Sequence, residues 1–217
     1  MDPNLVSSLL KQIEASDRST AAHTWRVVLY TRALAEAFGV DDDTLRRLTH
    51  AAALHDVGKI DIPNAILQKP GKLTDDEFEI MKLHTVTGFA RLAHIGVQDE
   101  IVLNLVKFHH EQWGGRGYPY GLEGEHIPPG ARYFAVIDTF DALTSHRPYR
   151  HDVGPEAAKR AIDELERGKG TRYWPDAVDA FIGLHGSGAI DWIGLHFNDG
   201  SNTPEFDAGG VDRLKPV

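Results

Sequence analysis

Apolar residues recur at helical spacing along most of this chain. They fall three or four positions apart, as on one face of an α-helix, and Gly, Pro or capping residues interrupt them. The helices predicted in this way span residues 5–14, 20–38, 43–56, 74–94, 98–111, 130–145, 155–167 and 175–184. We find no convincing alternating strand and no internal repeat. The sequence therefore predicts an all-α domain.

Local signals mark where these helices begin. Asp41 offers an N-cap, Thr74 with Glu77 resembles a capping box, and Pro155 and Pro175 suit the first turn of a helix. Residues 60–73 predict a loop with one helical turn around 65–67. Residues 112–129 predict a long loop rich in Gly and Pro, and such a loop in a compact domain is usually functional or disordered.

The chain after Gly186 reads as irregular apart from a short apolar piece, Ile190 to Phe197. We therefore divide the chain into a helical domain over residues 1–185 and an irregular C-terminal tail over 186–217, which would be an ordered flap or a flexible end. The helix over 5–14 is expected to pack on the domain or to form a contact in a homodimer. A regulatory protein partner for the tail remains an open alternative.

Composition narrows the function classes. The chain of 217 residues is 41% hydrophobic and 25% charged, and no apolar run approaches the roughly 20 residues that span a bilayer. It has no Cys, which excludes disulfides and thiolate metal sites and is compatible with the cytoplasm, where we expect the protein. The net charge of −9 disfavours nucleic-acid polymers and anionic membranes. A phosphate ligand would need a local cationic pocket.

The richest chemistry lies between residues 109 and 150. His109 and His110 close an apolar helix, a Gly-rich turn carries Tyr118, and a second apolar run presents Asp138. Two imidazoles with carboxylates suggest metal ions held by nitrogen and oxygen ligands. Arg147 and Arg150 follow, and guanidinium groups suggest a phosphate-bearing substrate.

Other candidate ligands have plain explanations when taken alone. His23 could be a surface or capping residue, His84 a satisfied core histidine, and the pair His55-Asp56 a chance dipeptide. Asp138 and Asp141 are three residues apart and share one helix face. Carboxylates are costly on such a face unless they are paired or bind a metal.

The order of these residues along the chain is specific. The sequence contains H-T-W-R-V from His23, H-D-V-G-K from His55, an isolated His84, H-H-E-x-W-G-G-x-G-Y-P from His109 and D-x-x-D-A-L-T-S-x-R-P-Y-R from Asp138. From about residue 20 to 184 it resembles the HD-GYP family of HD-superfamily phosphohydrolases. Members of that family fold as helical bundles around a metal centre and hydrolyse the bacterial messenger cyclic di-GMP.

The resemblance implies an all-α HD-superfamily bundle around a dinuclear metal centre, and a role for each matching residue. Asp56 would be the bridging carboxylate and Lys59 would contact the scissile phosphate or the nucleophile. Tyr118 would lie near the substrate, and Arg147 and Arg150 would grip its phosphates. The implied metal ligands are His23, His55, Asp56, His84, His109, His110 and Asp138.

The implied cofactors are two divalent metal ions. Nitrogen and oxygen ligands without sulfur fit iron or manganese, with zinc, nickel or cobalt as alternatives. Such a pair lowers the pKa of a bridging water and offsets charge on the phosphoryl oxygens, to which Lys59 would contribute. Glu111 or Asp141 would orient the ligating imidazoles.

Three positions depart from the family pattern. Ser19 stands where some members have a Glu for a third metal, and Asp17 would face elsewhere, so two metals are expected. Gly114 replaces the usual Asp or Asn of the signature loop and is expected to loosen that loop. His146 stands where Asp is usual and reads as a tolerated surface change.

The sequence thus predicts a phosphodiesterase that converts cyclic di-GMP to linear pGpG, GMP or both and ends a second-messenger signal. Another cyclic dinucleotide, such as cyclic GMP-AMP, is an alternative substrate. A non-catalytic module that binds a nucleotide or a partner should have lost a ligand or Lys59, and neither is lost. A diiron oxygenase is disfavoured by the signature loop and the paired arginines. Whether the chain works alone or as the output end of a sensor protein stays open.

Overall fold

The structure, a computed structural model, describes residues 2–16, 21–145, 155–198, 203–207 and 210–211. Within these residues no β-strand forms, and the only extended pairings are two isolated bridges, Gly114 with Glu123 and Lys169 with Tyr173. The predicted all-α fold is confirmed. The helices are α1 (Pro3–Ser16), α2 (Ala21–Ala37), α3 (Asp42–Leu54), η1 (Val57–Asp61), α4 (Asn64–Leu67), α5 (Asp75–Lys82), α6 (His84–His94), α7 (Glu100–Phe108), η2 (Gly124–His126), α8 (Pro129–Thr144), α9 (Pro155–Gly168), α10 (Pro175–Gly186) and α11 (Asp191–His196).

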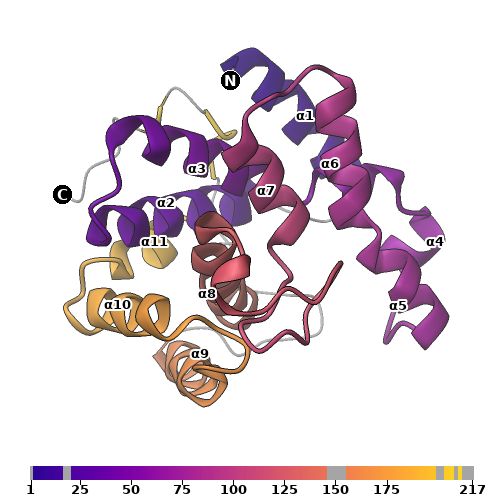
Figure 1. The fold of residues 1–217 in the computed structure, drawn as a ribbon. Helices are drawn as coiled ribbons and strands as arrows, with labels where there is room; N and C mark the ends of the chain where they lie inside the picture. Colours follow the sequence, from indigo (N-terminus) through magenta and orange to yellow (C-terminus); the bar gives the residue numbers. More distant parts are fainter. Residues whose placement is uncertain (1, 17–20, 146–154, 199–202, 208–209, 212–217) are drawn as a thin grey trace.

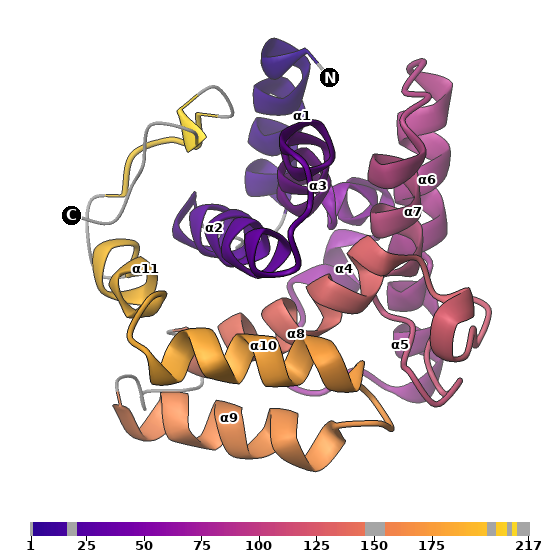
Figure 2. The same cartoon turned by 60° about the vertical axis from the view of Figure 1, so that its left-hand side comes forward.

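Helix α2 lies at the centre of the bundle (Figure 1). It packs against α3 and α8, while α3 contacts α7 and α7 contacts α6. Figure 2 shows α9 and α10 side by side at one end of the molecule, with α6 and α7 on the far side of α8. This arrangement brings the end of α3, the start of α6, the end of α7 and the middle of α8 towards one another.

The core is built from the apolar stripes of these helices. Val28, Leu34, Leu54 and Phe134 are fully buried, and burying such a side chain stabilises a fold by about 1.5–3 kcal/mol. The small side chains of residues 51–53 are buried as well and permit close packing between α3 and its neighbours. Capping follows the sequence signals, since Asp41 caps α3 and Thr74 forms a capping box with Glu77.

The single helix predicted over residues 74–94 is wrong, because the chain breaks at Leu83 into α5 and α6. His84 Nδ1 donates to the carbonyl oxygen of Met81 over 2.7 Å, and Thr85 Oγ1 donates to that of Lys82 over 3.0 Å. These side chains take carbonyls that the backbone of a continuous helix would use. His84 is therefore the first residue of α6 instead of a mid-helix residue.

Two other predicted boundaries also change. The helix predicted over residues 98–111 ends at Phe108, with His109 as its C-cap, so that His110 and Glu111 already belong to the following loop. That loop is not wholly irregular, because η2 forms within it at residues 124–126.

The irregular tail also needs correction, because Asp191–His196 form α11 and the residues around it are buried against α2. Trp25 stacks on Phe197, with ring centroids 5.1 Å apart, and also contacts Phe206. The indole nitrogen of Trp25 donates to the carbonyl of Pro204 over 3.0 Å. The boundary at residue 185 stays a prediction, but the described part of the tail packs on the bundle.

None of the described helices combines the length and the apolar character that crossing a bilayer requires.

Candidate metal centre

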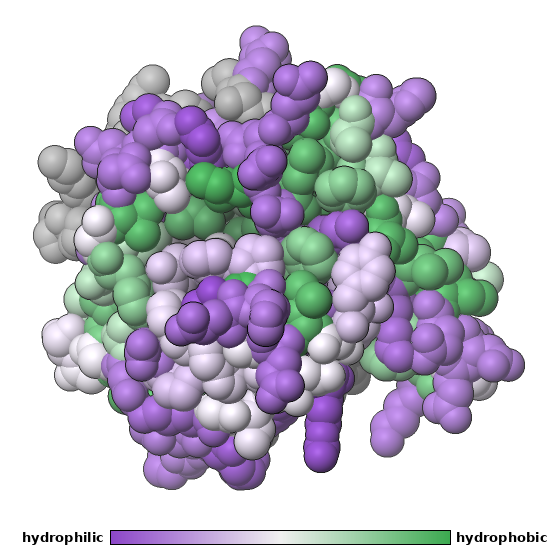
Figure 3. Space-filling view, viewed as in Figure 1, coloured by the Kyte–Doolittle hydropathy of each residue, from purple (hydrophilic) through white to green (hydrophobic). Residues whose placement is uncertain are grey.

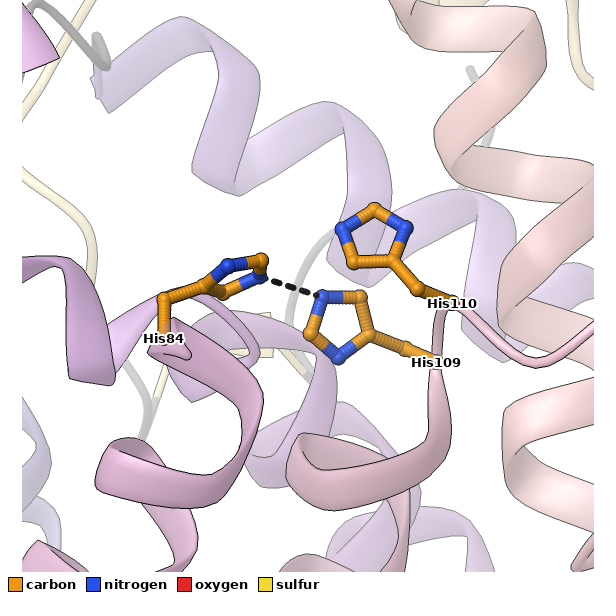
Figure 4. A group of neighbouring side chains, drawn as sticks. All are labelled: His84, His109 and His110. Carbon is orange, nitrogen blue, oxygen red and sulfur yellow. Dashed lines mark hydrogen bonds between the residues drawn. The ribbon is translucent and has the colours of Figure 1, made fainter. Parts of the chain in front are cut away.

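Two groups of side chains at the centre of the bundle have the composition of metal sites. One group is His84, His109 and His110, and the other is His23, His55 and Asp56. Within each group the potential ligand atoms lie within 4.8 Å of one another. Figure 4 shows the first group, with His84 pointing across at His109 and with His110 alongside. Six of the seven predicted metal ligands therefore meet in these two groups.

Three of the imidazoles are oriented in the same way. The Nδ1 atoms of His55, His84 and His109 each lie within hydrogen-bonding distance of the carbonyl three residues earlier, at 2.8, 2.7 and 2.9 Å. A carbonyl oxygen only accepts, so each Nδ1 carries the proton and donates it. In the neutral rings of His84 and His109, the other ring nitrogen, Nε2, then presents its lone pair to the centre, whereas Nε2 of His55 faces the carboxylate of Asp56. This is the arrangement that metal-binding histidines usually adopt.

A cation fits the space between these rings. His84 Nε2 lies 3.3 Å from His109 Nε2, the contact drawn as a dashed line in Figure 4. With both Nδ1 atoms protonated, two neutral rings would turn lone pairs towards each other. Burial lowers the pKa of both rings, that of His109 well below the usual value, so a shared proton is disfavoured. A divalent metal ion would satisfy both lone pairs.

Burial also lowers the pKa of His110, to about 3, and the neighbouring His84 adds to the effect. Neutral imidazole is the form that binds metals. The lowered pKa values of these three histidines favour the neutral form, which is the ligating one.

His23 is oriented by a carboxylate on another helix. Its Nδ1 donates to Asp141 Oδ2 over 2.7 Å, and the same carboxylate accepts from the guanidinium of Arg26. Although burial raises the pKa of Asp141, Arg26 and His23 outweigh that effect and hold the pKa below its usual range. Asp141 thus contacts the imidazole of His23, while the ligating role of His23 stays a prediction.

Asp56 lies between the two groups of histidines. Its Oδ2 atom is 3.1 Å from His55 Nε2, and its Oδ1 atom is 3.5 Å from His84 Nε2. Burial raises the pKa of Asp56, but His55 and Lys59 together hold it well below the usual value. An ionised carboxylate that faces histidines of both groups has the position expected of a bridging ligand.

Lys59 projects from η1 towards the same carboxylate, with its Nζ atom 2.8 Å from Asp56 Oδ2. Its location depends on Gly58, which packs against the start of α6. A Cβ at Gly58 would lie 1.9 Å from the carbonyl oxygen of His84, so no other residue fits there. The motif H-D-V-G-K thus ties η1 to the α6 histidine and sets an ammonium beside the centre.

Asp138, the seventh predicted ligand, lies outside both groups but close to them. It lines a cavity of about 180 Å³ together with His109, His110 and Arg172. Its charge also raises the pKa of His55, against the effect of burial and in addition to that of Asp56. Asp138 therefore faces the centre from α8.

The signature loop presents Tyr118 to the centre. Its ring stacks on His110, with centroids 4.7 Å apart and an angle of 29° between the planes. Gly117 makes this possible, because a Cβ there would lie 2.3 Å from the backbone nitrogen of Gln112. The backbone nitrogen of Tyr118 also donates to the carbonyl of His110 over 3.2 Å.

Of the two carboxylates expected to orient an imidazole, Glu111 has another role, since its carboxylate accepts the backbone N–H groups of Tyr120 and Leu122 at 2.8 and 2.9 Å. Glu111 thus fastens the loop in place. The expected loosening of the loop by Gly114 stays a prediction. The backbone nitrogen of Gly114 donates to the carbonyl of Thr171 over 2.7 Å, and Gly114 pairs with Glu123 in a bridge.

Five residues from the sequence argument lie outside the described residues: Asp17, Ser19, His146, Arg147 and Arg150. Conversely, two charged residues were missed. Arg26 is buried and forms an ion pair with Asp141, and its place three residues after His23 on one helix face was the available signal. Arg172 lines the cavity beside Asp138, and nothing in the local sequence indicates this.

This helical bundle has at its centre two groups of histidine and aspartate side chains that could hold metal ions. The sequence matches the HD domain family over residues 6–177. It is also 42% identical to a cyclic di-GMP phosphodiesterase of Thermotoga maritima over 176 residues, which cover 79% of this chain and 46% of that protein. A 3'3'-cGAMP-specific phosphodiesterase of Vibrio cholerae is 37% identical over 82% of this chain and 34% of its own length.

A crystal structure of a cyclic GMP-AMP-specific phosphodiesterase of V. cholerae has the same fold. It superposes with a TM-score of 0.66 at 16% identity, over 97% of this chain and 52% of that chain. The chain therefore belongs to the HD domain family, and its motifs are of the HD-GYP type. It spans less than half the length of these two curated relatives.

Proposed function

We propose that the protein is a metal-dependent phosphodiesterase that hydrolyses cyclic di-GMP to linear pGpG, GMP or both. The observation that supports this best is the convergence of two histidine groups on Asp56, with Lys59 2.8 Å from that carboxylate. The identity of 42% to a cyclic di-GMP phosphodiesterase supports the choice of substrate.

In this proposal His84, His109 and His110 hold one metal ion, and His23 and His55 hold the other. Asp56 bridges the two ions and Asp138 completes the ligand set. Bound ions would activate a water molecule near neutral pH and offset charge on the phosphoryl oxygens. The nitrogen and oxygen donors favour iron or manganese, with zinc, nickel or cobalt as alternatives.

The chain's own residues prepare the centre for this chemistry. The backbone carbonyls and Asp141 fix the histidine tautomers, so that the ligand nitrogens need not reorganise when an ion binds. The ammonium of Lys59 would stabilise negative charge that develops on the scissile phosphate. Tyr118 would contact the substrate, while Arg147 and Arg150 would bind its phosphates.

A second candidate substrate is cyclic GMP-AMP, because a relative that is 37% identical is named as specific for it. Both molecules present the same phosphodiester backbone to metals and cations, so discrimination between the two substrates would depend on contacts with their bases. The possible homodimer, a regulatory partner and a cytoplasmic location remain predictions.

The test is to incubate the purified, metal-loaded protein with cyclic di-GMP or 3'3'-cGAMP under anaerobic conditions, with Mn²⁺ or Fe²⁺. Chromatography should reveal linear pGpG or GMP from cyclic di-GMP. Faster turnover of 3'3'-cGAMP would favour the second candidate. Absence of hydrolysis of both dinucleotides by a fully metal-loaded protein would contradict the proposed activity.

A further inference from the structure

Exposed apolar side chains occur on and next to α5, the helix that precedes His84. Among the large apolar side chains that are exposed in the described residues, Phe78, Ile80 and Leu83 fall within six positions of one another on or next to α5. In Figure 3, hydrophobic surface is visible on the right of the molecule, where Figure 1 places α4 and α5. Phe78 is 45% exposed, so part of its surface is open to a ligand.

Phe78 is linked to the metal centre through Tyr118. The two rings meet edge to face, with centroids 6.4 Å apart and an angle of 82° between their planes. Tyr118 in turn stacks on His110 and also contacts the ring of His84, at 6.4 Å. One aromatic ring therefore separates Phe78 from two of the predicted metal ligands.

A cation completes this arrangement. Lys82 Nζ lies 5.0 Å from the ring centroid of Phe78 and 5.7 Å from that of Tyr118. It also donates to Glu79 Oε1 over 2.6 Å, which keeps the ammonium near the two rings. The break between α5 and α6 follows Lys82 directly, so the same break that positions His84 also positions this lysine.

We infer that Phe78, Tyr118 and Lys82, here called the aromatic corner, bind one guanine base of the substrate. This inference rests on the proposed function and adds a site that recognises the base. If one phosphate lies at the metals, the nucleoside attached to it extends outwards from the metal centre. At the edge of the centre the aromatic corner offers it an aromatic ring and a cation. Bases stack on exposed aromatic side chains in proteins that bind single nucleotides or strands.

The ammonium gives the corner a preference between bases. Guanine presents two acceptors, N7 and O6, on one edge, whereas adenine presents the acceptor N7 beside the N6 amino donor. The ammonium of Lys82 only donates, so it complements the guanine edge and opposes the adenine amino group. The aromatic corner should therefore favour guanine through Lys82 and bind either base through Phe78.

The experiment compares Phe78→Ala, Phe78→Leu and Lys82→Met with the wild-type protein, using cyclic di-GMP as substrate and cyclic di-AMP as competitor. Both Phe78 variants should raise the KM for cyclic di-GMP and the inhibition constant of cyclic di-AMP about tenfold, with kcat and metal content unchanged. Lys82→Met should weaken the binding of cyclic di-GMP about five- to tenfold, and it should leave the binding of cyclic di-AMP unchanged or make it tighter.

Two matched control variants are available. Ile80→Ala removes another exposed apolar side chain of α5, and Lys107→Met removes a lysine that lies over the rings of Phe89 and Tyr120 at 4.4 and 4.9 Å. Neither should change the KM for cyclic di-GMP. A wild-type KM in the Phe78 variants, or an equal loss in the controls, would overturn the inference.

Calorimetric binding of cyclic di-GMP to the same variants separates the two proposals. If the wild-type protein shows no turnover, the proposed activity fails, while a tenfold weaker Kd in Phe78→Ala would still support the aromatic corner. If the wild-type protein is active and Phe78→Ala binds with an unchanged Kd, the aromatic corner fails and the proposed activity stands.

Discussion

His23 on α2 donates a hydrogen bond from Nδ1 to the carboxylate of Asp141 over 2.7 Å. Asp141 lies on α8, more than a hundred residues further along the chain. The same carboxylate neutralises the buried guanidinium of Arg26. One side chain on α8 thus orients a candidate metal ligand and compensates a buried charge, so its loss should affect both metal binding and stability.

We expect Asp141→Asn to lower metal affinity about 10- to 100-fold. The carboxylate offers one acceptor oxygen each to His23 and Arg26, whereas an amide keeps only one, so its NH2 group would face one of these donors and disturb the orientation of His23. Leaving Arg26 without a charged partner should also destabilise the fold by about 3–5 kcal/mol. Metal titration and urea unfolding measure the two effects. Asp163→Asn, which removes an exposed partner of Lys159, is the control and should change neither. Unaltered metal affinity in Asp141→Asn would contradict the role assigned to this carboxylate.

Lys59 and His55 should behave differently when replaced. His55→Ala or Asp56→Ala should remove both metal and activity, since each deletes a predicted ligand. Lys59→Ala should retain the metal but slow turnover, because its ammonium acts on the phosphate and lies beside Asp56 without being a ligand. Elemental analysis with steady-state kinetics tests both expectations, and loss of metal in Lys59→Ala would show that the role proposed for Lys59 is wrong.

Metal content should be about two ions per chain after anaerobic purification. The structure brings together two groups of three potential ligands each, and Ser19 occupies the position from which a third-metal Glu would be expected. Elemental analysis of several preparations gives the number directly. A reproducible value near three would require another ligand set and would refute the two-metal proposal.

Arg147→Ala and Arg150→Ala should each weaken substrate binding about 10- to 100-fold with unchanged metal content, because a guanidinium can bind phosphate through two hydrogen bonds. Lysine should substitute incompletely, since it lacks the planar pair of donors. Steady-state kinetics on the Ala and Lys variants tests this. If KM and kcat remain at wild-type values in both Ala variants, other residues bind the substrate phosphates, and Arg116 is the next candidate.

The metal-free protein should lose stability as the pH falls. Burial lowers the pKa of His84, His109 and His110, the last to about 3, whereas these imidazoles take up protons near pH 6.5 in the unfolded chain. The unfolded state then binds more protons below pH 6.5, so the free energy of unfolding should decrease from that pH downwards. The raised pKa of His55 has the opposite effect on the free energy of unfolding, but it is one group, whereas three histidines have lowered pKa values.

Urea unfolding of the metal-free protein at pH 7.5 and pH 5.5 measures this dependence. His110→Gln should reduce it, because one of the three groups that resist protonation is removed. A free energy of unfolding that is equal or higher at pH 5.5 would contradict the prediction.

The sequence by itself determined the helical class and most helix positions, because helical periodicity and caps act within a few residues. The seven candidate ligands came from the resemblance of its motifs to the HD-GYP family, and six of them meet in the two histidine groups. The seventh, Asp138, lines the adjacent cavity.

Only the tertiary structure decided which atoms meet. At the break at Leu83, His84 bonds to Met81 and Gly58 packs against the start of α6, a contact between segments 26 residues apart in the numbering. The contact of Asp141 with His23 and that of Phe78 with Tyr118 arise from long-range packing. The anchoring role of Glu111 depends on how the signature loop closes on itself. Such contacts leave no local periodic signal, because they depend on how the helices pack and not on the residues along any one of them.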